Sequence, residues 1–363
     1  LRSGRPFFPL GLYHVRQQDL ARVAAGGFNF VASHASTFPP DWPQPGDGVG
    51  YLEAAGQAGL TSVGLGAGIH RPEAAAKVFG HYRANPAVVT WYLADEPGGP
   101  GEQPEDLRRG YEQWAALDPT HPIFLLQNKP GEFYRYAPAC DIFATDPYPI
   151  RADAAPPLGQ VAEYTRGAVD AVFGQKPVWV ALQCYTVHSA TEPARELPPR
   201  LPTLDELRNM SYQALAAGAR GLLYYAFDDT YFNNGQIRGV HLAREYPDFW
   251  AQLQTLAAEV GAHRELWCAP YATARPRADL PDLVVQSRPY QLDGALALLV
   301  VNLQRAPREA QVALPGLPDQ VAVTDLLGGS PGGLAGGVLT DRLGPLQAKC
   351  YRIPTKAAAE SRP

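Results

Sequence analysis

The chain alternates short, continuously hydrophobic runs with longer stretches in which apolar residues recur every three or four positions. The runs are rich in Val, Ile, Phe and Tyr, which is typical of strands that are buried on both faces. Eight such runs predict strands, over Phe7–Tyr13, Phe28–Ser36, Thr61–Ala67, Val88–Glu96, Ile123–Asn128, Asp141–Tyr148, Pro177–Tyr185 and Gly221–Phe227.

The stretches between the runs have the apolar spacing of amphipathic helices. Thr203 followed three residues later by Glu206 is a capping-box pattern that predicts a helix start, and Gly174 is a helix-ending signal. The predicted helices cover Asp19–Ala25, Gly50–Ala58, Pro72–Ala84, Pro104–Leu117, Glu132–Tyr136, Gln160–Phe173, Leu204–Ala217 and Phe249–Trp267.

Eight strand–helix units in about 260 residues have the length and rhythm of a (β/α)8 TIM barrel of the α/β class. A doubly wound open sheet is the alternative. That fold would favour a glycine-rich phosphate loop after the first strand, where this chain has Gly11-Leu12-Tyr13-His14. The sequence therefore favours the closed barrel.

After Trp267 the pattern changes to short strands separated by Gly and Pro turns, which predicts a small antiparallel β-sandwich-like domain. We therefore expect a barrel over residues 1–267, a C-terminal β domain over 268–354 and a flexible tail over 355–363. The predicted strands of the β domain are Leu283–Ser287, Ala295–Asn302, Ala310–Leu314, Gln320–Asp325 and Ala348–Ile353.

Five barrel strands end on the same arrangement, an Ala, any residue, and then a polar residue. Because side chains alternate along a strand, each Ala and its polar partner share one face. If that face is inward, small residues lie beneath a ring of polar groups at the carboxyl end of the barrel, where such folds carry their active sites. The opposing interpretation is chance, since Ala is common here. The instances end on His34, Glu96, Asp146, Gln183 and Asp228.

The sharpest local signal is the fourth strand, which ends on Asp95-Glu96-Pro97. A buried strand that stops on two acids must present them to something polar, because an unpaired buried charge is costly. Alternation makes Asp95 and Glu96 face opposite ways, so we expect Glu96 inward and Asp95 as a supporting hydrogen-bond partner. A helix cap or a surface ion pair is the bland alternative.

Four further strand-end residues are candidates with equally bland alternatives. Asp146 precedes a Pro and Asp228 opens a loop, so each is also a plausible turn or cap acid. His14 and His34 could contact substrate, although a lone His is more often a satisfied structural group. The first strand has no His-x-His pair, so we expect neither a catalytic metal nor another cofactor.

Composition narrows the classes of partner. The net charge of −5 and the scattered Arg residues argue against nucleic acid, and no apolar run has the length of a membrane span. The 36 Pro and 35 Gly fall mostly at predicted turns between the strands and helices of a long barrel.

We expect Cys140 and Cys184 to be buried thiols, whereas Cys268 and Cys350 could pair. A secreted or periplasmic location is plausible, although no signal peptide is visible; the oligomeric state is left open.

Asp95-Glu96-Pro97 is similar to the Asn-Glu-Pro motif of the (β/α)8 glycoside hydrolases whose general acid is a Glu that ends strand four. The resemblance covers about 265 residues and includes the segments Asp141–Tyr148 and Lys176–Tyr185, which look like strands six and seven of that clan. It implies that Glu96 is the general acid. The nucleophile of the clan is a Glu that ends strand seven, where this chain has Gln183, and an amide cannot form the glycosyl-enzyme ester.

The leading hypothesis is therefore a glycoside hydrolase that acts on an oligosaccharide or polysaccharide. Glu96, its pKa raised by an enclosed site, would protonate the leaving oxygen, and Asp146 or Asp228 would be the second carboxylate. Strands four, six and eight are not adjacent, which favours a water between the acids and hence inversion. Gln183 equally suits a non-catalytic carbohydrate-binding barrel, and a lyase is a weaker third reading. The predicted substrate contacts are His14, His34, Asp95, Asn128, Tyr148, Gln183 and Tyr225.

Overall fold

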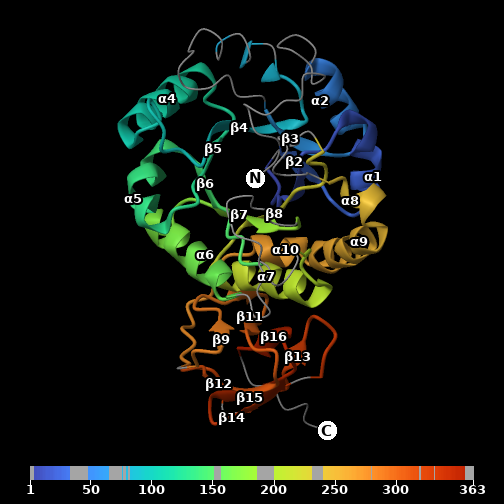
Figure 1. The fold of residues 1–363 in the computed structure, drawn as a ribbon. Helices are drawn as coiled ribbons and strands as arrows, with labels where there is room; N and C mark the ends of the chain where they lie inside the picture. The colour runs from blue at the N-terminus through green and yellow to red at the C-terminus, as the bar shows by residue number, and fades with distance from the viewer. Residues whose placement is uncertain are drawn as a thin grey trace, which may run out of the picture.

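The computed structural model describes residues 4–32, 48–64, 76, 79–80, 82–150, 157–185, 200–230, 240–278, 280–318, 320–330 and 332–355. Its first part is a closed barrel of parallel strands in the order β1 to β8, with β8 pairing back onto β1 (Figure 1), which confirms the predicted fold class. The strands are β1 (Leu10–Tyr13), β2 (Phe30–Ala32), β3 (Thr61–Gly64), β4 (Val88–Asp95), β5 (Ile123–Leu126), β6 (Ile142–Thr145), β7 (Val178–Gln183) and β8 (Gly221–Tyr225).

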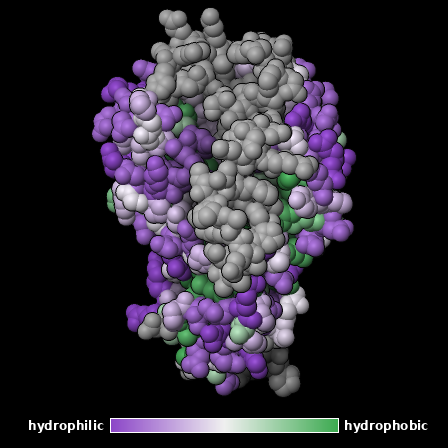
Figure 2. Space-filling model, in the orientation of Figure 1, coloured by the Kyte–Doolittle hydropathy of each residue, from purple (hydrophilic) through white to green (hydrophobic). Residues whose placement is uncertain are grey.

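Helices form an outer ring around these strands (Figure 1). On the face shown in Figure 2 their outer surfaces are mostly hydrophilic, as expected for helices that pack one stripe on the barrel and expose the other. The predicted capping box at Thr203 and Glu206 is present. The helices include α1 (Leu20–Ala25), α2 (Gly48–Gln57), α4 (Pro104–Leu117), α5 (Phe133–Tyr136), α6 (Gln160–Ala171), α7 (Leu204–Ala217), α8 (Leu242–Glu245), α9 (Pro247–Ala262) and α10 (Arg264–Cys268), with single 3-10 turns at Gln17–Asp19, Pro130–Glu132 and Ala137–Ala139.

Two apolar cores result from the alternation of side chains along the strands. One core fills the barrel and the other lies between the strands and the helices. Of the alanines that precede the strand-end polar residues, Ala32, Ala144, Ala181 and Ala226 lie in the inner core, as the Ala-x-polar pattern predicts. Ala94 packs instead against the outer core.

A register shift in β4 explains the exception. Tyr92 pairs with Phe124 of β5, Ala94 with Leu125 and Asp95 with Leu126, so one residue of β4 is extra. Such a bulge reverses the phase of alternation beyond it. Asp95 therefore shares its face with inward Leu126, and the expectation that Asp95 would point away from the barrel axis is wrong.

The chain leaves the barrel helices at the end of α10 and forms two antiparallel sheets below α7 (Figure 1). Sequence reasoning missed β10, β14 and β15, because these short segments alternate polar and apolar residues next to Gly turns. One sheet contains β9 (Leu283–Val285), β10 (Tyr290–Leu292), β11 (Ala295–Asn302), β13 (Thr324–Asp325) and β16 (Ala348–Pro354), and the other contains β12 (Arg308–Ala313), β14 (Gly333–Ala335) and β15 (Val338–Leu343).

Strand β11 ties the two parts of the molecule together because it is buried on both faces. Leu298 belongs to a core between the two sheets, whereas Leu299 belongs to the outer core of the barrel. Asn209 of α7 donates hydrogen bonds to the carbonyls of Asn302 and Leu346 at 2.7 and 2.9 Å. The β domain therefore packs on the barrel through both apolar and polar contacts.

All four cysteines are free thiols, so the considered pairing of Cys268 with Cys350 is not formed. Cys140 and Cys184 are buried, as predicted, and burial raises the pKa of both thiols. Among the helices that the structure describes, none is long and apolar enough to cross a bilayer.

Candidate active site

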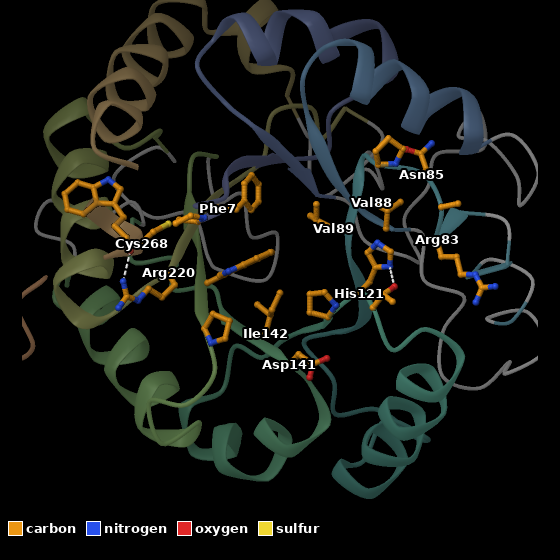
Figure 3. Close-up of a pocket in the computed structure, with 18 residues that line it drawn as sticks. Phe7, Arg83, Asn85, Val88, Val89, His121, Asp141, Ile142, Arg220 and Cys268 are labelled. Atoms are coloured by element: carbon orange, nitrogen blue, oxygen red, sulfur yellow. Dashed lines mark hydrogen bonds between the residues drawn. The ribbon is translucent and has the colours of Figure 1, made fainter. Parts of the chain in front are cut away.

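The two ends of the barrel differ in how their polar groups are used. At the amino ends of the strands lies a cavity of about 680 Å³, with Arg220 and Cys268 on one side of Phe7 and Val89 and with His121 on the other (Figure 3). Its polar groups are engaged within the protein. Arg220 donates to the carbonyls of Trp267 and Ala269, and His121 Nδ1 lies 2.7 Å from Asp118. In barrels of this kind, residues at the amino ends of the strands usually serve stability and not catalysis.

At the carboxyl ends of the strands, two acids meet. Glu96 follows β4 in a left-handed backbone conformation (φ 44°), and it acts on the carboxyl group of Asp146, which follows β6. Glu96 is exposed, whereas Asp146 is only 6% exposed. The structure therefore brings the two predicted acids together at this end of the barrel.

Asp146 is the acid of this pair whose pKa is raised. Burial is the first cause, and the interaction with Glu96 and the charge of Asp95 add to it, so the pKa lies well above its usual range. Its Oδ1 atom is buried and accepts no hydrogen bond from the described residues, so an ionised oxygen there would be uncompensated. The acid enclosed by the site is therefore Asp146, not Glu96 as the sequence led us to expect.

Asp95 is the third carboxylate at the carboxyl end of the barrel, which is called the mouth below. The hydroxyl of Tyr92 donates to Asp95 Oδ1 at 2.5 Å, and the charge of Asp95 acts on Asp146. Burial comes first among the causes that raise the pKa of Tyr92, and the charge of Asp95 comes second, so this phenol remains a protonated donor. Asp95 therefore has a hydrogen-bond donor in Tyr92 and lies on the inward face of β4.

Three tyrosines form an aromatic wall beside the acids. The ring of Tyr225 lies 5.9 Å from that of Tyr148 and 5.3 Å from that of Tyr185, and Tyr148 acts on the carboxyl group of Asp146. Each of the three is partly exposed. A partly exposed aromatic surface next to carboxyl groups can stack on the apolar face of a sugar while the acids act on its oxygens.

His14 completes this wall from β1. Its ring lies 5.0 Å from that of Tyr225, and its Nδ1 atom lies 2.5 Å from Asp229 Oδ1. His14 is 3% exposed and has a left-handed backbone (φ 57°), a conformation that costs free energy in a non-glycine residue. A carboxylate on one ring nitrogen fixes the orientation of the other, as in catalytic and metal sites.

Two predicted residues have structural roles instead. Asp228 lies 2.7 Å from Arg16 Nε, and its Oδ1 accepts from the backbone and hydroxyl of Thr230, so it is the turn acid of the bland alternative. Gln183 is fully buried; its Oε1 accepts from Ile150 N, and its Nε2 donates to the carbonyls of Ile150 and Tyr185. These bonds fix the loop after β6 to β7. They engage the buried amide of Gln183 within the protein.

Asn128 and His34 are the remaining candidates. Asn128 follows β5, between the strands that carry Glu96 and Asp146, and its buried Oδ1 has no hydrogen-bond partner among the described residues. His34 lies outside the residues that the structure describes. In the described part of the chain, no group of three His, Cys, Asp or Glu side chains could hold a metal ion.

Sequence reasoning missed the roles of Tyr92, Tyr13 and Asp229. Tyr92 and Tyr13 read as ordinary core tyrosines because strand residues give no sign of which partner their hydroxyl meets. Asp229 was visible only as the neighbour of Asp228. The sequence offered one sign: Tyr92 lies two residues before Ala94, so the Ala-x-polar pattern would place its side chain inward.

Comparison with known proteins supports the fold. No protein-family model and no curated protein matches the chain. Among solved structures, the chain is similar to an alpha-amylase from Geobacillus thermoleovorans complexed with acarbose (11% identity, TM-score 0.63, covering 94% of this chain and 92% of that one). It is also similar to a putative alpha-galactosidase/melibiase from Bacteroides fragilis (13%, 0.61, 96% and 79%) and to a GH27 β-L-arabinopyranosidase from Geobacillus stearothermophilus complexed with arabinose (14%, 0.59, 96% and 97%). These neighbours are glycoside hydrolases with (β/α)8 barrels. Identities this low establish a shared fold and nothing finer.

Proposed function

We propose that the chain is a glycoside hydrolase-like enzyme that cleaves a glycosidic bond in an oligosaccharide or polysaccharide. The observation that carries the proposal is the pairing of Glu96 with Asp146 at the carboxyl end of the barrel, where Asp146 is buried and its pKa is raised well above its usual range. Barrels of this kind place their chemistry at that end. Glycoside hydrolases are among the solved structures of the same fold, which supports hydrolysis of a glycosidic bond as the reaction to test.

In the proposed mechanism the pair is the general acid. Asp146 stores the proton, and Glu96 is the exposed member that faces the leaving oxygen. As the bond between the anomeric carbon and that oxygen breaks, its electron pair passes to the oxygen, which takes the proton, and a water molecule adds to the anomeric carbon. The added water releases one proton, and the repulsion between the two ionised carboxylates favours its uptake by the pair.

We assign substrate contacts to four of the predicted residues. Tyr148 and Tyr225 offer ring faces for stacking, the ring of His14 packs against that of Tyr225, and Asn128 offers the unpaired Oδ1 as an acceptor for a sugar hydroxyl. An acceptor that is buried without a partner is costly, and a hydroxyl group would compensate it.

The test is hydrolysis of a panel of glycosides and oligosaccharides by the wild-type protein, Glu96→Gln and Glu105→Gln. Glu105, on the exposed first turn of α4, is the matched control. We expect turnover by the wild type and the control, and a loss of about 100-fold or more in Glu96→Gln. Undiminished hydrolysis by Glu96→Gln would overturn the acid role. Sugar binding in calorimetry without turnover of any substrate would favour the non-catalytic barrel instead.

A further inference from the structure

A chain of hydrogen bonds lies directly beneath the three acids. The hydroxyls of Tyr13 (β1) and Tyr92 (β4) lie 3.3 Å apart, and that of Tyr92 donates to Asp95 Oδ1 at 2.5 Å. Both tyrosines belong to the inner core of the barrel and are at most 2% exposed. The chain therefore connects the floor of the mouth to one oxygen of Asp95.

The bulge in β4 makes this contact available. Without the extra residue, alternation from Tyr92 would place Asp95 on the opposite face, toward the helices. With it, Asp95 returns to the inward face, three residues after the tyrosine that holds it. Bulges that re-aim a side chain occur preferentially next to active sites.

Asp95 and Asp228, the other candidate for a second carboxylate, lie in different surroundings. Asp228 is buried and ion-paired with Arg16. Asp95 is exposed on the inward face of β4, and its charge acts on Asp146.

We infer that Asp95 is a catalytic carboxylate of the proposed hydrolase, and that Tyr92 and Tyr13 are residues that position it. The inference rests on the proposed function. As the leaving oxygen takes its proton from the acid pair, positive charge develops at the anomeric carbon and the ring oxygen. A carboxylate held in a fixed orientation stabilises that charge without reorganising. The donor hydroxyl of Tyr92 provides the orientation, and Tyr13 holds Tyr92.

The kinetic test compares Asp95→Asn, Tyr92→Phe and Tyr224→Phe. Tyr224 is the matched control, since it is a fully buried barrel tyrosine whose hydroxyl bonds to Ser211 on the outward side. We expect Asp95→Asn to lower kcat by about 1,000-fold or more. Tyr92→Phe should lower kcat by about 10- to 100-fold with KM changed less than about threefold, and should move the acidic limb of the pH profile upward, whereas Tyr224→Phe should do neither.

A second readout does not need activity. Carboxyl carbon NMR of the wild-type protein and of the two tyrosine variants follows the Asp95 carboxyl group directly. We expect its resonance to shift in Tyr92→Phe, which removes the donor to Asp95, and to stay unchanged in Tyr224→Phe. An unchanged resonance in Tyr92→Phe would overturn the positioning role.

The outcomes separate the two claims. Full activity of Asp95→Asn would overturn its catalytic role even if the Asp95 resonance shifts as expected in Tyr92→Phe. A wild-type protein that hydrolyses no glycan would overturn the proposed function, and with it the catalytic role of Asp95. The NMR result would still decide whether Tyr92 positions that carboxylate.

Discussion

At the scale of single residues, two acids in contact have different surroundings. Glu96 is exposed and has a left-handed backbone, whereas Asp146 is enclosed and its pKa is raised well above its usual range. Two like charges close together in an enclosed site cannot both ionise without a large cost, so we expect the pair to hold one proton. This difference in exposure is why we assign storage of the proton to Asp146 and its delivery to Glu96.

Replacing Asp146 with Asn should stabilise the protein near neutral pH and abolish turnover. The folded state binds the Asp146 proton more tightly than the unfolded chain does, so wild-type stability falls as pH rises above about 4. Asn is neutral and keeps the shape of the protonated acid. The gain should be about 1.4 kcal/mol for each pH unit between the unfolded pKa and the working pH, up to the folded pKa.

Urea unfolding of the wild type and Asp146→Asn at pH 4.5 and pH 7.5 measures this. The two proteins should be nearly equal at the lower pH and diverge at the higher one. An equal difference at both values would mean that Asp146 is not the proton carrier.

Gln183 is the second residue at which a direct test is available. Gln183→Glu would restore the strand-seven carboxylate of the resembled clan, but it would bring an acid against the carbonyls of Ile150 and Tyr185 and lose two donated hydrogen bonds. We expect a loss of about 2–4 kcal/mol in unfolding free energy and no gain in hydrolysis. Gln175→Glu, at an exposed position, is the control and should change stability by less than about 0.5 kcal/mol. Higher activity in Gln183→Glu would contradict the structural role.

At the scale of elements, the sequence predicted every barrel strand, because short, continuously apolar runs are typical of parallel strands that are buried on both faces. It did not predict the phase of side chains at the end of β4. A bulge has no signature in the pattern of hydrophobic residues, since Leu93 and Ala94 are apolar on either face. The Ala-x-polar pattern succeeded at Ala144 and failed at Ala94 for that reason.

The start of α7 is sensitive to pH through Glu206. Burial alone would raise the pKa of Glu206, but hydrogen bonds from Arg200, from the backbone of Thr203 and from Arg305 of the β domain outweigh it and lower the pKa to about 2. A depressed pKa stabilises the fold above the unfolded value near 4.3, and this stability is lost as pH falls toward 2.

Wild type should therefore lose about 2–3 kcal/mol through this group between pH 5 and pH 2, and Glu206→Gln should show a shallower fall over the same range. Unfolding free energies of both proteins at the two pH values check the prediction. Glu112→Gln, which removes an exposed carboxylate paired with Arg108, should keep the wild-type slope. Parallel curves for wild type and Glu206→Gln would contradict it.

At the scale of the whole molecule, the β domain shares a core with the barrel. Both faces of β11 are buried, and α7 is packed between the barrel strands and the sheet. The sequence predicted the change from barrel to β domain at Trp267 from the loss of helical spacing. It could not predict the junction, because the hydrogen bonds of Asn209 join residues that are about a hundred positions apart.

The shared core predicts a single cooperative unfolding transition, with equal midpoints by calorimetry and by near-UV circular dichroism. Asn209→Ala should lower the unfolding free energy by about 2–4 kcal/mol, because it leaves two buried carbonyls and the donor of Gln213 unpaired. Gln252→Ala, on the exposed face of α9, is the control. Two separate transitions in the wild type would show that the domains fold independently.

The most direct test of the central claim is a crystal structure of Glu96→Gln soaked with oligosaccharides on which the wild type is active, or with the whole panel if none is cleaved. The account predicts sugar density at the carboxyl end of the barrel, stacked on Tyr225 or Tyr148. A glycosidic oxygen should lie within hydrogen-bond distance of residue 96, with the anomeric carbon above Asp95. Sugar bound only elsewhere, such as in the cavity at the amino ends of the strands, or no bound sugar at all, would contradict the account.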